Sequence, residues 1–341
     1  MGRVAVIGDG PAGLLAATAL SRAGHEVTLF APPAARTAHH RHVHRIPAAT
    51  LAAMEAMAGS ALDGWEIGPL LFAMGGRTET LPPQPVVDIA KLLASLRVRA
   101  DAAGVKRYSI NGRKAVSAKS GLWHAGESDG AYTHLIDASG AGRSVAGQIA
   151  EAHGFAWSVD EIGARDHYRS FSVSTRGLTR PASWAAKAEI AGMPCDIYVA
   201  CDGEGAAQIT LSHSAGFPSP CPLDVMAAFR VAGGGWADRV FAATGQSERA
   251  AAFNACAATL LSLDLRDLAQ IPPYLPIGDC LVQTRPRLGQ GFTQIAAQVE
   301  LITSGIAANT EDMAALQDAL FGHAHAAWAA AAMRDTLPRA A

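Results

Sequence analysis

Three glycines near the start of the chain have the spacing of a phosphate-binding turn. Gly8, Gly10 and Gly13 follow the apolar segment RVAVIG and precede a stretch with apolar residues at helical spacing. Gly8 permits a tight turn, Gly10 lets the backbone approach a pyrophosphate, and Gly13 lets the helix pack closely on the strand. Because the helix N-terminus also presents free N–H groups and a positive dipole end, we expect this segment to bind a dinucleotide. The expected contacts are Gly8, Gly10, Pro11, Ala12 and Gly13.

The next apolar segment, EVTLFA, ends without the acidic residue that usually binds the ribose hydroxyls of such a nucleotide. Ala31 occupies that position, and Asp9 lies too close to the pyrophosphate turn to replace the acid. The adenosine ribose is therefore either held in another way or held weakly, with a cofactor that exchanges. A glycine turn in an unrelated α/β fold is the alternative interpretation.

A second glycine-rich segment lies near the other end of the chain. An apolar strand ends in Gly278 and Asp279, and the sequence PRLGQG from Pro286 then precedes a long predicted helix. Here the sequence resembles the flavoprotein monooxygenases of the p-hydroxybenzoate hydroxylase superfamily, whose late motif reads G-D, a spacer, and P-x-x-G-Q-G. The resemblance implies that Asp279 binds the ribityl chain of FAD and that the glycine loop lies against the isoalloxazine ring. The implied FAD contacts in this segment are Asp279, Gly289, Gln290, Gly291 and Phe292.

The physical chemistry of this second segment agrees with the resemblance. A carboxylate accepts hydrogen bonds from ribityl hydroxyls, and bare glycine backbone can approach a flat ring. The N-terminus of the predicted helix favours negative charge on a reduced flavin.

A third segment, HRHVHR (residues 40–45), resembles the R-H-x-H-x-L segment of epoxidase-like and hydroxylase-like members of the same superfamily. The resemblance implies that Arg41 contacts the cofactor. His44 and Arg45 are candidate catalytic residues that tune protonation, and Pro286 would border the oxygen-reactive face of the flavin. A solvated loop of histidine and arginine is the alternative. Since these histidines have no cysteine or carboxylate nearby, we expect no metal site.

Two further positions depart from the pattern of the superfamily. Ile89 follows Asp88 where an arginine is expected, and Ser139 stands where an aspartate is common. Arg97 or Arg99 would compensate only if the helix turned them toward the cofactor, and otherwise they are surface charges. Taken with the missing acid on the second strand, these departures predict loose FAD binding. They also favour reduced flavin delivered by a partner flavin reductase over direct reduction by NAD(P)H.

The motifs require a fold that brings distant segments together. We expect an α/β protein with a Rossmann-type, GR2-like FAD-binding domain formed by residues 1–150 and 265–341, including the C-terminal helices. Residues 151–264 contain segments typical of antiparallel strands, such as YRSFSVST and CDIYVAC. We expect these residues to form an inserted mixed, largely antiparallel sheet that binds the substrate. Residues 61–85 are expected to contribute to it.

Composition limits the function classes. The chain has 341 residues, 50% of them hydrophobic and 17% charged, and a formal net charge of −2. These values are typical of a globular protein and give no electrostatic reason to expect nucleic acid or an anionic membrane as a partner. Five cysteines without a C-x-x-C pair are typical of a reducing compartment, and no apolar run is long enough for a membrane span. We expect a cytoplasmic protein.

The resemblance implies an FAD-dependent monooxygenase that uses O2 to hydroxylate or epoxidise an aromatic or unsaturated small molecule through a flavin C4a-(hydro)peroxide. Two enzymatic alternatives remain: a flavin-dependent reductase or dehydrogenase of the geranylgeranyl reductase type, and a flavoprotein that acts on a side chain of a partner protein during quinone-cofactor maturation. A non-catalytic nucleotide-binding protein is the alternative from another class. Halogenation is disfavoured because SWAAKA, around Trp184 and Lys187, lacks the W-x-W-x-I-P motif of flavin halogenases.

Overall fold

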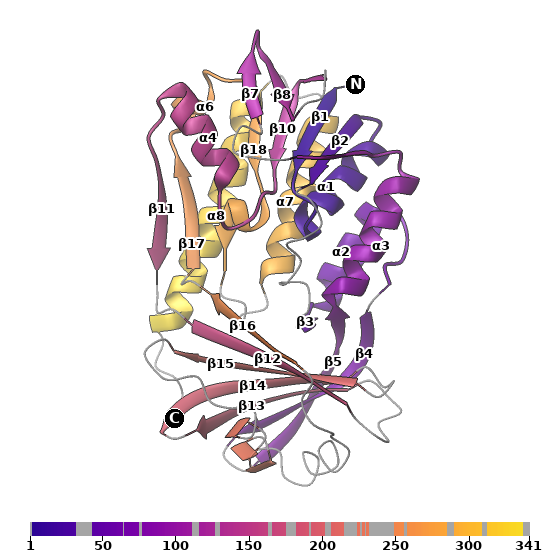
Figure 1. The fold of residues 1–341 in the computed structure, drawn as a ribbon, viewed down its shortest axis with the longest axis vertical. Coiled ribbons are helices and arrows are strands. Elements are labelled where there is room, and N and C mark those ends of the chain that lie inside the picture. Colours follow the sequence, from indigo (N-terminus) through magenta and orange to yellow (C-terminus); the bar gives the residue numbers. More distant parts are fainter. Residues whose placement is uncertain are drawn as a thin grey trace.

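The computed structural model describes most of the chain. The described residues are 2–31, 43–63, 65–74, 77–110, 116–126, 130–162, 166–174, 182–190, 192–201, 206–214, 249–255, 258–284, 290–308 and 312–336, with six further residues between 224 and 231. The fold is mixed α/β, with a parallel sheet and helices in one half and a large, mainly antiparallel sheet in the other (Figure 1).

A five-stranded parallel sheet forms the centre of the first half. Four of its strands are mainly apolar and buried, as expected for strands that are covered on both faces, and the edge strand of sequence KRYS is exposed. Helices cover the sheet, which contains both the first strand of the chain and a strand that comes more than 260 residues later. The strands in sheet order are β18 (Tyr274–Pro276), β10 (His134–Asp137), β1 (Arg3–Ile7), β2 (Glu26–Ala31) and β6 (Lys106–Ser109).

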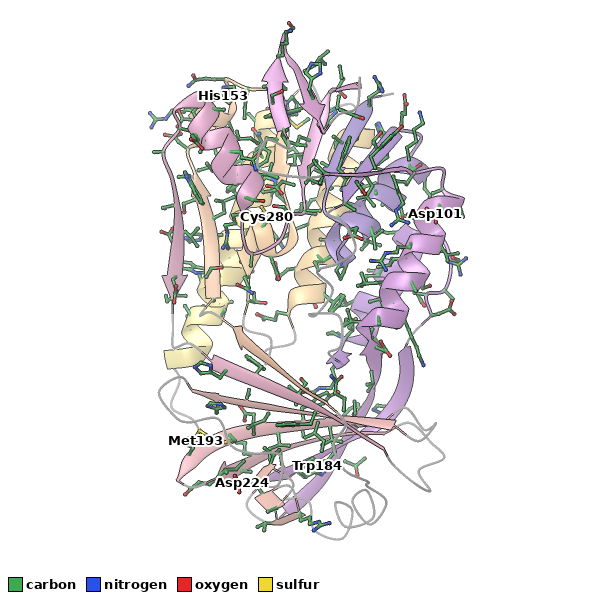
Figure 2. The ribbon with its side chains drawn as sticks, viewed as in Figure 1. Asp101, His153, Trp184, Met193, Asp224 and Cys280 are labelled. Atoms are coloured by element: carbon green, nitrogen blue, oxygen red, sulfur yellow. The ribbon has the colours of Figure 1, made fainter. Side chains whose placement is uncertain are left out.

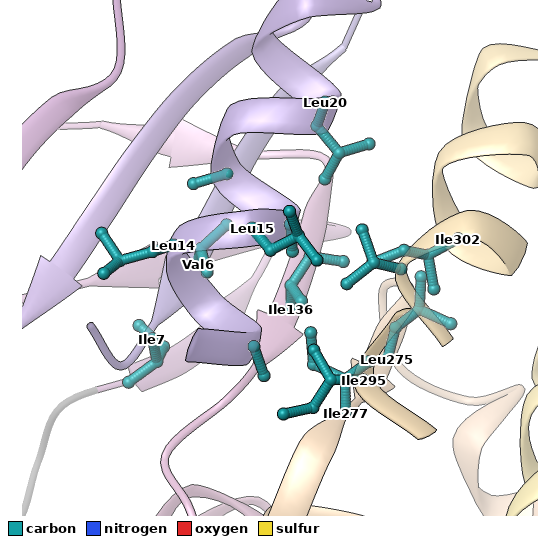
Figure 3. Close-up of a cluster of buried hydrophobic side chains, with 14 of the residues drawn as sticks. Val6, Ile7, Leu14, Leu15, Leu20, Ile136, Leu275, Ile277, Ile295 and Ile302 are labelled. Atoms are coloured by element: carbon teal, nitrogen blue, oxygen red, sulfur yellow. The ribbon is translucent and has the colours of Figure 1, made fainter. Parts of the chain in front are cut away.

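The helices of this half pack through one continuous apolar core. Helix α1 (Pro11–Arg22) contacts both α3 (Ile89–Ala102) and α7 (Gly291–Ala307). Figure 3 shows Leu15 of α1 and Ile302 of α7 converging over strand residue Ile136. The remaining helical elements are α2 (Ala48–Ala58), α4 (Ser144–His153), α6 (Leu265–Leu268), α8 (Met313–Thr336) and the 3-10 turn η2 (Gly278–Cys280).

An eight-stranded sheet forms the second half of the molecule. Only the pairing of β13 with β4 is parallel, and the other neighbours run antiparallel. Two of its strands come from residues 65–88, between the first helices of the parallel half. In sheet order the strands are β16 (Arg249–Ala255), β12 (Asp166–Ser174), β15 (Ala206–Ser214), β14 (Met193–Cys201), β13 (Ala182–Ile190), β4 (Trp65–Met74), β5 (Arg77–Asp88) and β3 (Val43–Arg45).

Two three-stranded antiparallel sheets complete the described strands. The first joins β11 (Trp157–Ile162), β17 (Ala258–Leu263) and β19 (Val282–Gln283). In sequence, β11 precedes and β17 follows the strands β12 to β16 of the large sheet, and β19 follows β18 of the parallel sheet. The second consists of β7 (Val116–Lys119), β8 (Leu122–Ala125) and β9 (Ala131–Tyr132).

Most expected elements are confirmed. The expected first strand, helix and second strand correspond to β1, α1 and β2, and the strands expected from YRSFSVST and CDIYVAC are antiparallel neighbours of β15. The boundaries of the expected cofactor and substrate domains stay a prediction.

Candidate functional site

The glycine turn between β1 and α1 leaves the first backbone N–H groups of the helix without a side-chain cap. Gly10 is the N-cap residue, its φ is −72°, and Pro11 follows at the first helical position. Gly8 has a φ of +112°, and a side chain there would meet the carbonyl of Ala138. A methyl group on Gly13 would overlap the carbonyl of Gly8. The turn therefore depends on its glycines, and the uncapped helix end is suited to an anion.

The two glycine-rich segments from opposite ends of the chain lie against each other. A Cβ atom built on Gly278 would be 2.9 Å from the Cβ of Ala12 in the first turn of α1. Backbone hydrogen bonds join the ends of three neighbouring strands: Ala138 N–H donates to the Ile7 carbonyl, and Ile277 N–H donates to the Asp137 carbonyl, both at 2.8 Å. The carboxyl ends of β1, β10 and β18 thus meet at one edge of the parallel sheet, where α/β proteins bind nucleotides.

Side chains from separate elements hold the η2 turn that carries Asp279. The Gln298 side-chain carbonyl of α7 accepts the Gly278 N–H at 2.7 Å. Arg143, the buried N-cap residue of α4, donates from Nε to the Cys280 carbonyl at 2.9 Å and from Nη2 to Thr259 Oγ1 at 2.7 Å. Arg143 adopts left-handed backbone geometry, with a φ of +48°, in this position. The turn is therefore fixed before any ligand binds.

Asp279 itself combines solvent exposure with a raised pKa. Its side chain is exposed to solvent. Desolvation by the surrounding protein nevertheless raises the pKa of this carboxyl, and the Arg143 guanidinium opposes the shift. Because solvent reaches Asp279, its carboxylate can accept hydrogen bonds from hydroxyl groups of a ligand.

A buried polar cluster lies directly behind this turn. Asp137 has no solvent exposure, and its Oδ2 accepts from the Tyr274 hydroxyl at 2.7 Å and from the Cys280 thiol at 3.1 Å. Its Oδ1 accepts the Ser139 N–H at 3.0 Å. Burial, with the Asp137 charge nearby, raises the pKa of both Tyr274 and Cys280 well above the usual values, so both stay protonated as donors. Figure 2 labels Cys280 in this half of the molecule.

The N-terminus of α7 forms another part of the same region. Gln290 is the N-cap, Gly291 is exposed and Phe292 is buried. Among the described residues, Gln290 makes no side-chain capping bond, and a Cβ at Gly291 would meet no atom within 4 Å. The buried side-chain oxygens of Gln290 and Gln294 likewise have no hydrogen-bond partner in the described part of the chain. Pro286 and Gly289 lie outside the described residues.

Arg45 joins two strands of the large sheet that are not neighbours. Its guanidinium lies over the ring of Tyr198, 5.0 Å from the ring centroid, although β13, β4 and β5 separate β3 from β14 in the sheet. The sheet must therefore curl so that its β3 edge folds over one face (Figure 1). The backbone of His44 lies in β3, where it pairs with Val87. Arg41 lies outside the described residues.

The face of the large sheet below Arg45 is polar. Ser170 and Thr210 bond through their hydroxyls at 3.0 Å, and Thr210 lies opposite Tyr198. Buried Ser183 and Ser212 belong to the same face by strand alternation. The opposite face carries a second apolar core, which contains Trp184, Phe171, Ile197, Val199, Ile209 and Leu211 (Figure 2 labels Trp184). Trp184 and Phe171 are thus core residues.

Arg97 has a role that the sequence interpretation as a surface charge missed. Its Nη2 lies 3.1 Å from Asp9 Oδ2 in the glycine turn. Arg99 instead donates to the Ala61 carbonyl. Ile89, at the position of the expected arginine, is buried in the core. Arg97 and Arg99 differ in the direction in which they project from α3, and only Arg97 projects toward the glycine turn. That direction depends on how α3 is rotated about its axis in the folded protein, which the sequence alone does not show.

Two further findings concern metal binding and membrane insertion. Within the described ranges, no three histidine, cysteine, aspartate or glutamate side chains group as metal ligands would. None of the helices that the structure describes, the 24-residue α8 included, combines the length and apolar character of a membrane span.

Comparisons with known proteins support the fold. No protein-family model matches the chain, and no curated protein matches it. Among solved structures, PqsL of P. aeruginosa bound to 2-aminobenzoylacetate has a TM-score of 0.70 at 15% identity, with 96% of this chain and 92% of PqsL covered. CtdE, solved with FAD and a substrate, has a TM-score of 0.67 at 14% identity, covering 99% of this chain and 88% of CtdE.

The peptidyl tryptophan dihydroxylase QhpG has a TM-score of 0.65 at 17% identity, with 99% of this chain and 76% of QhpG covered. The similar structures also include flavin-dependent halogenases, so the fold alone does not separate oxygen insertion from halogenation. The chain has the fold of this class of flavoproteins, and the resemblance expected from the sequence motifs is confirmed at that level.

Proposed function

We propose that the protein is an FAD-dependent monooxygenase that hydroxylates or epoxidises an aromatic or unsaturated substrate. The observation that carries this proposal is the contact of Gly278 with Ala12, since it brings a dinucleotide turn and a G-D turn from opposite ends of the chain to one edge of a parallel sheet. The flavoprotein fold of the whole chain supports it. Sequence, geometry and fold therefore favour the same class of chemistry.

The described residues fit FAD at this edge. The uncapped N-terminus of α1 and Gly10, which has nothing within 4 Å of a built Cβ, would hold the pyrophosphate. Asp279, which is exposed, would accept from ribityl hydroxyls, and the uncapped N-terminus of α7 at Gly291 would face the isoalloxazine ring. Bound FAD would supply the redox chemistry with O2.

The protein's own part in the reaction is to bind and orient the substrate and to exclude water. The polar face of the large sheet, with Arg45 held over Tyr198, supports a substrate site between the two halves. Arg45 would position the substrate or hold a proton near it. We retain His44 and Pro286 as candidate catalytic residues on the sequence argument.

The proposed electron source follows from the positions at which the sequence departs from the superfamily pattern. Ala31 is half-buried at the end of β2, where no acid is available, and Ser139 follows β10. We expect reduced flavin to be supplied by a partner flavin reductase, with direct reduction by NAD(P)H as the other route. Rapid reduction of tightly co-purifying FAD by NADPH would contradict the partner route.

The test begins with a visible spectrum and an FAD titration of the purified protein. The loaded protein is then supplied with a flavin reductase and NADH, and O2 uptake is measured with a panel of styrene, indole, 4-hydroxybenzoate and a tryptophan-containing peptide. We expect a product that is heavier by one oxygen atom. A product that differs by two hydrogen atoms would indicate a reductase or dehydrogenase, and modification of the peptide alone would indicate a protein substrate. A protein that takes up no FAD would contradict the proposal.

A further inference from the structure

The ion pair between Asp9 and Arg97 places two opposite charges in the turn that would receive a pyrophosphate. Asp9 lies between Gly8 and Gly10, and Arg97 reaches it from α3 at 3.1 Å. The two side chains are 24% and 31% exposed, so the pair is partly shielded yet accessible from solvent. The contact links residues 88 positions apart in the sequence.

Asp9 alone would oppose an anion at this turn. A carboxylate beside a helix N-terminus is favourable when no ligand is bound, but it repels a phosphate that approaches the same N–H groups. Charges a few ångströms apart at a partly shielded position interact by several kcal/mol at most, which is enough to change affinity strongly. A turn that binds pyrophosphate therefore needs a cation that neutralises Asp9.

Arg97 has the chemistry to do this and to contact the ligand as well. A guanidinium carries five N–H donors in a planar fork that matches phosphate oxygens. The bond to Asp9 uses the Nη2 group, and in the described part of the chain Asp9 is the one ion-pair partner of Arg97. Donors thus remain for a second anion. Ile89 cannot contribute, because it is buried in the core at the start of the same helix.

We propose that Arg97 binds the pyrophosphate of FAD and that Asp9 orients the Arg97 guanidinium for this contact. The inference rests on the proposed function, because it takes FAD as the ligand. The pair compensates for the arginine that is missing at position 89, from a place about two helical turns farther along α3. It also explains how the turn tolerates an acidic residue between its first two glycines.

The experiment compares FAD binding to full-length variants by quenching of flavin fluorescence. Arg97→Met removes the charge and keeps much of the volume, and Arg97→Lys keeps a point charge without the fork. Arg99→Met is the matched control, because Arg99 lies on the same helix and bonds to the Ala61 carbonyl instead. ADP serves as a partial ligand that carries the pyrophosphate, and riboflavin serves as one that lacks it. Circular dichroism melting checks that each variant is folded.

We expect R97M to weaken FAD and ADP binding by about tenfold to a hundredfold and to leave riboflavin binding unchanged, as for the loss of a charge-assisted hydrogen bond. R97K should lose less, and R99M should stay within about twofold of the wild type. The double variant D9N/R97M should recover part of the affinity that R97M loses, because no unneutralised carboxylate then faces the phosphates.

Three outcomes would overturn the assignment: unchanged FAD affinity in folded R97M, an equal loss in R99M, or an equal loss of riboflavin binding. Each of these leaves the proposed function intact, provided that the wild type binds FAD. A wild type that binds neither FAD nor ADP would contradict the proposed function as well.

Discussion

Asp137 is fully buried, yet three hydrogen bonds converge on its carboxylate. The donors come from the loop after β10, from β18 and from the η2 turn. Removing one partner from such a cluster leaves buried polar groups without bonds, which costs more than the bonds contribute when intact. The Asp137 cluster thus supports the η2 turn that carries Asp279.

We expect Asp137→Asn to lower the free energy of unfolding by about 2–3 kcal/mol, because the amide retains one acceptor oxygen where the carboxylate has two. Urea denaturation followed by circular dichroism measures the change. Tyr274→Phe is the matched comparison: it removes a single donor at 2.7 Å and should cost about 1 kcal/mol. Equal stability of D137N and wild type would show that the cluster contributes nothing.

At the scale of elements, the turn between β1 and α1 contains two glycines with opposite requirements. A methyl group on Gly13 would overlap the Gly8 carbonyl, whereas a built Cβ on Gly10 meets nothing within 4 Å. Gly13 is needed for the strand and helix to pack, and Gly10 leaves room for a ligand.

We expect Gly13→Ala to destabilise the protein so strongly that little folded protein is recovered, and Gly10→Ala to melt close to the wild-type temperature. G10A should nevertheless bind FAD at least about tenfold more weakly, because its methyl group occupies the space of the pyrophosphate. Differential scanning fluorimetry and flavin titration test the two effects separately. Normal FAD affinity in G10A would mean that the phosphates bind elsewhere.

The elements nearest the glycine motifs were predictable because local rules determine them. RVAVIG, the turn and the following helix need only apolar patterning and glycine geometry, and β1 and α1 match that expectation. The direction of Arg97 and the contact of Arg45 with Tyr198 were not predictable. Both depend on how helices and a curled sheet are oriented in space, and no spacing along the chain encodes that orientation.

At the scale of the whole molecule, the pairing of the two chain ends followed from the motifs, but the composition of the large sheet did not. Residues 61–85 were expected to contribute to it, and the structure forms β4 and β5 from residues 65–88. The inclusion of β3 and the pairing of β11 and β17 with β19 carried no sequence signal. Long-range strand pairing is decided by which surfaces remain to be buried.

Stability should depend on pH through His134 at the start of β10. Desolvation, with His25 nearby, lowers the pKa of His134 from the ordinary histidine value of 6.5 to about 4. The unfolded chain therefore binds the proton more readily, so this stability is complete above about pH 6.5 and is lost as the pH falls toward 4.

We expect His134→Gln to show a smaller fall in melting temperature between pH 7 and pH 5 than the wild type. His153→Gln, at the exposed end of α4, is the control and should keep the wild-type response. Identical pH responses of H134Q and wild type would contradict this assignment. Buffers of constant ionic strength keep surface electrostatics the same across the series.

The contact between Gly278 and Ala12 has a consequence for synthesis on the ribosome. The glycine turn is made early, but β18 and α7, which pack beside it, begin only at Tyr274 and Gly291. Until they have been translated and have left the ribosome, the apolar edge of β10 and one side of α1 have no cover, which is the kind of surface that chaperones bind. Nascent chains of this protein should therefore remain dependent on such help until α7 has emerged.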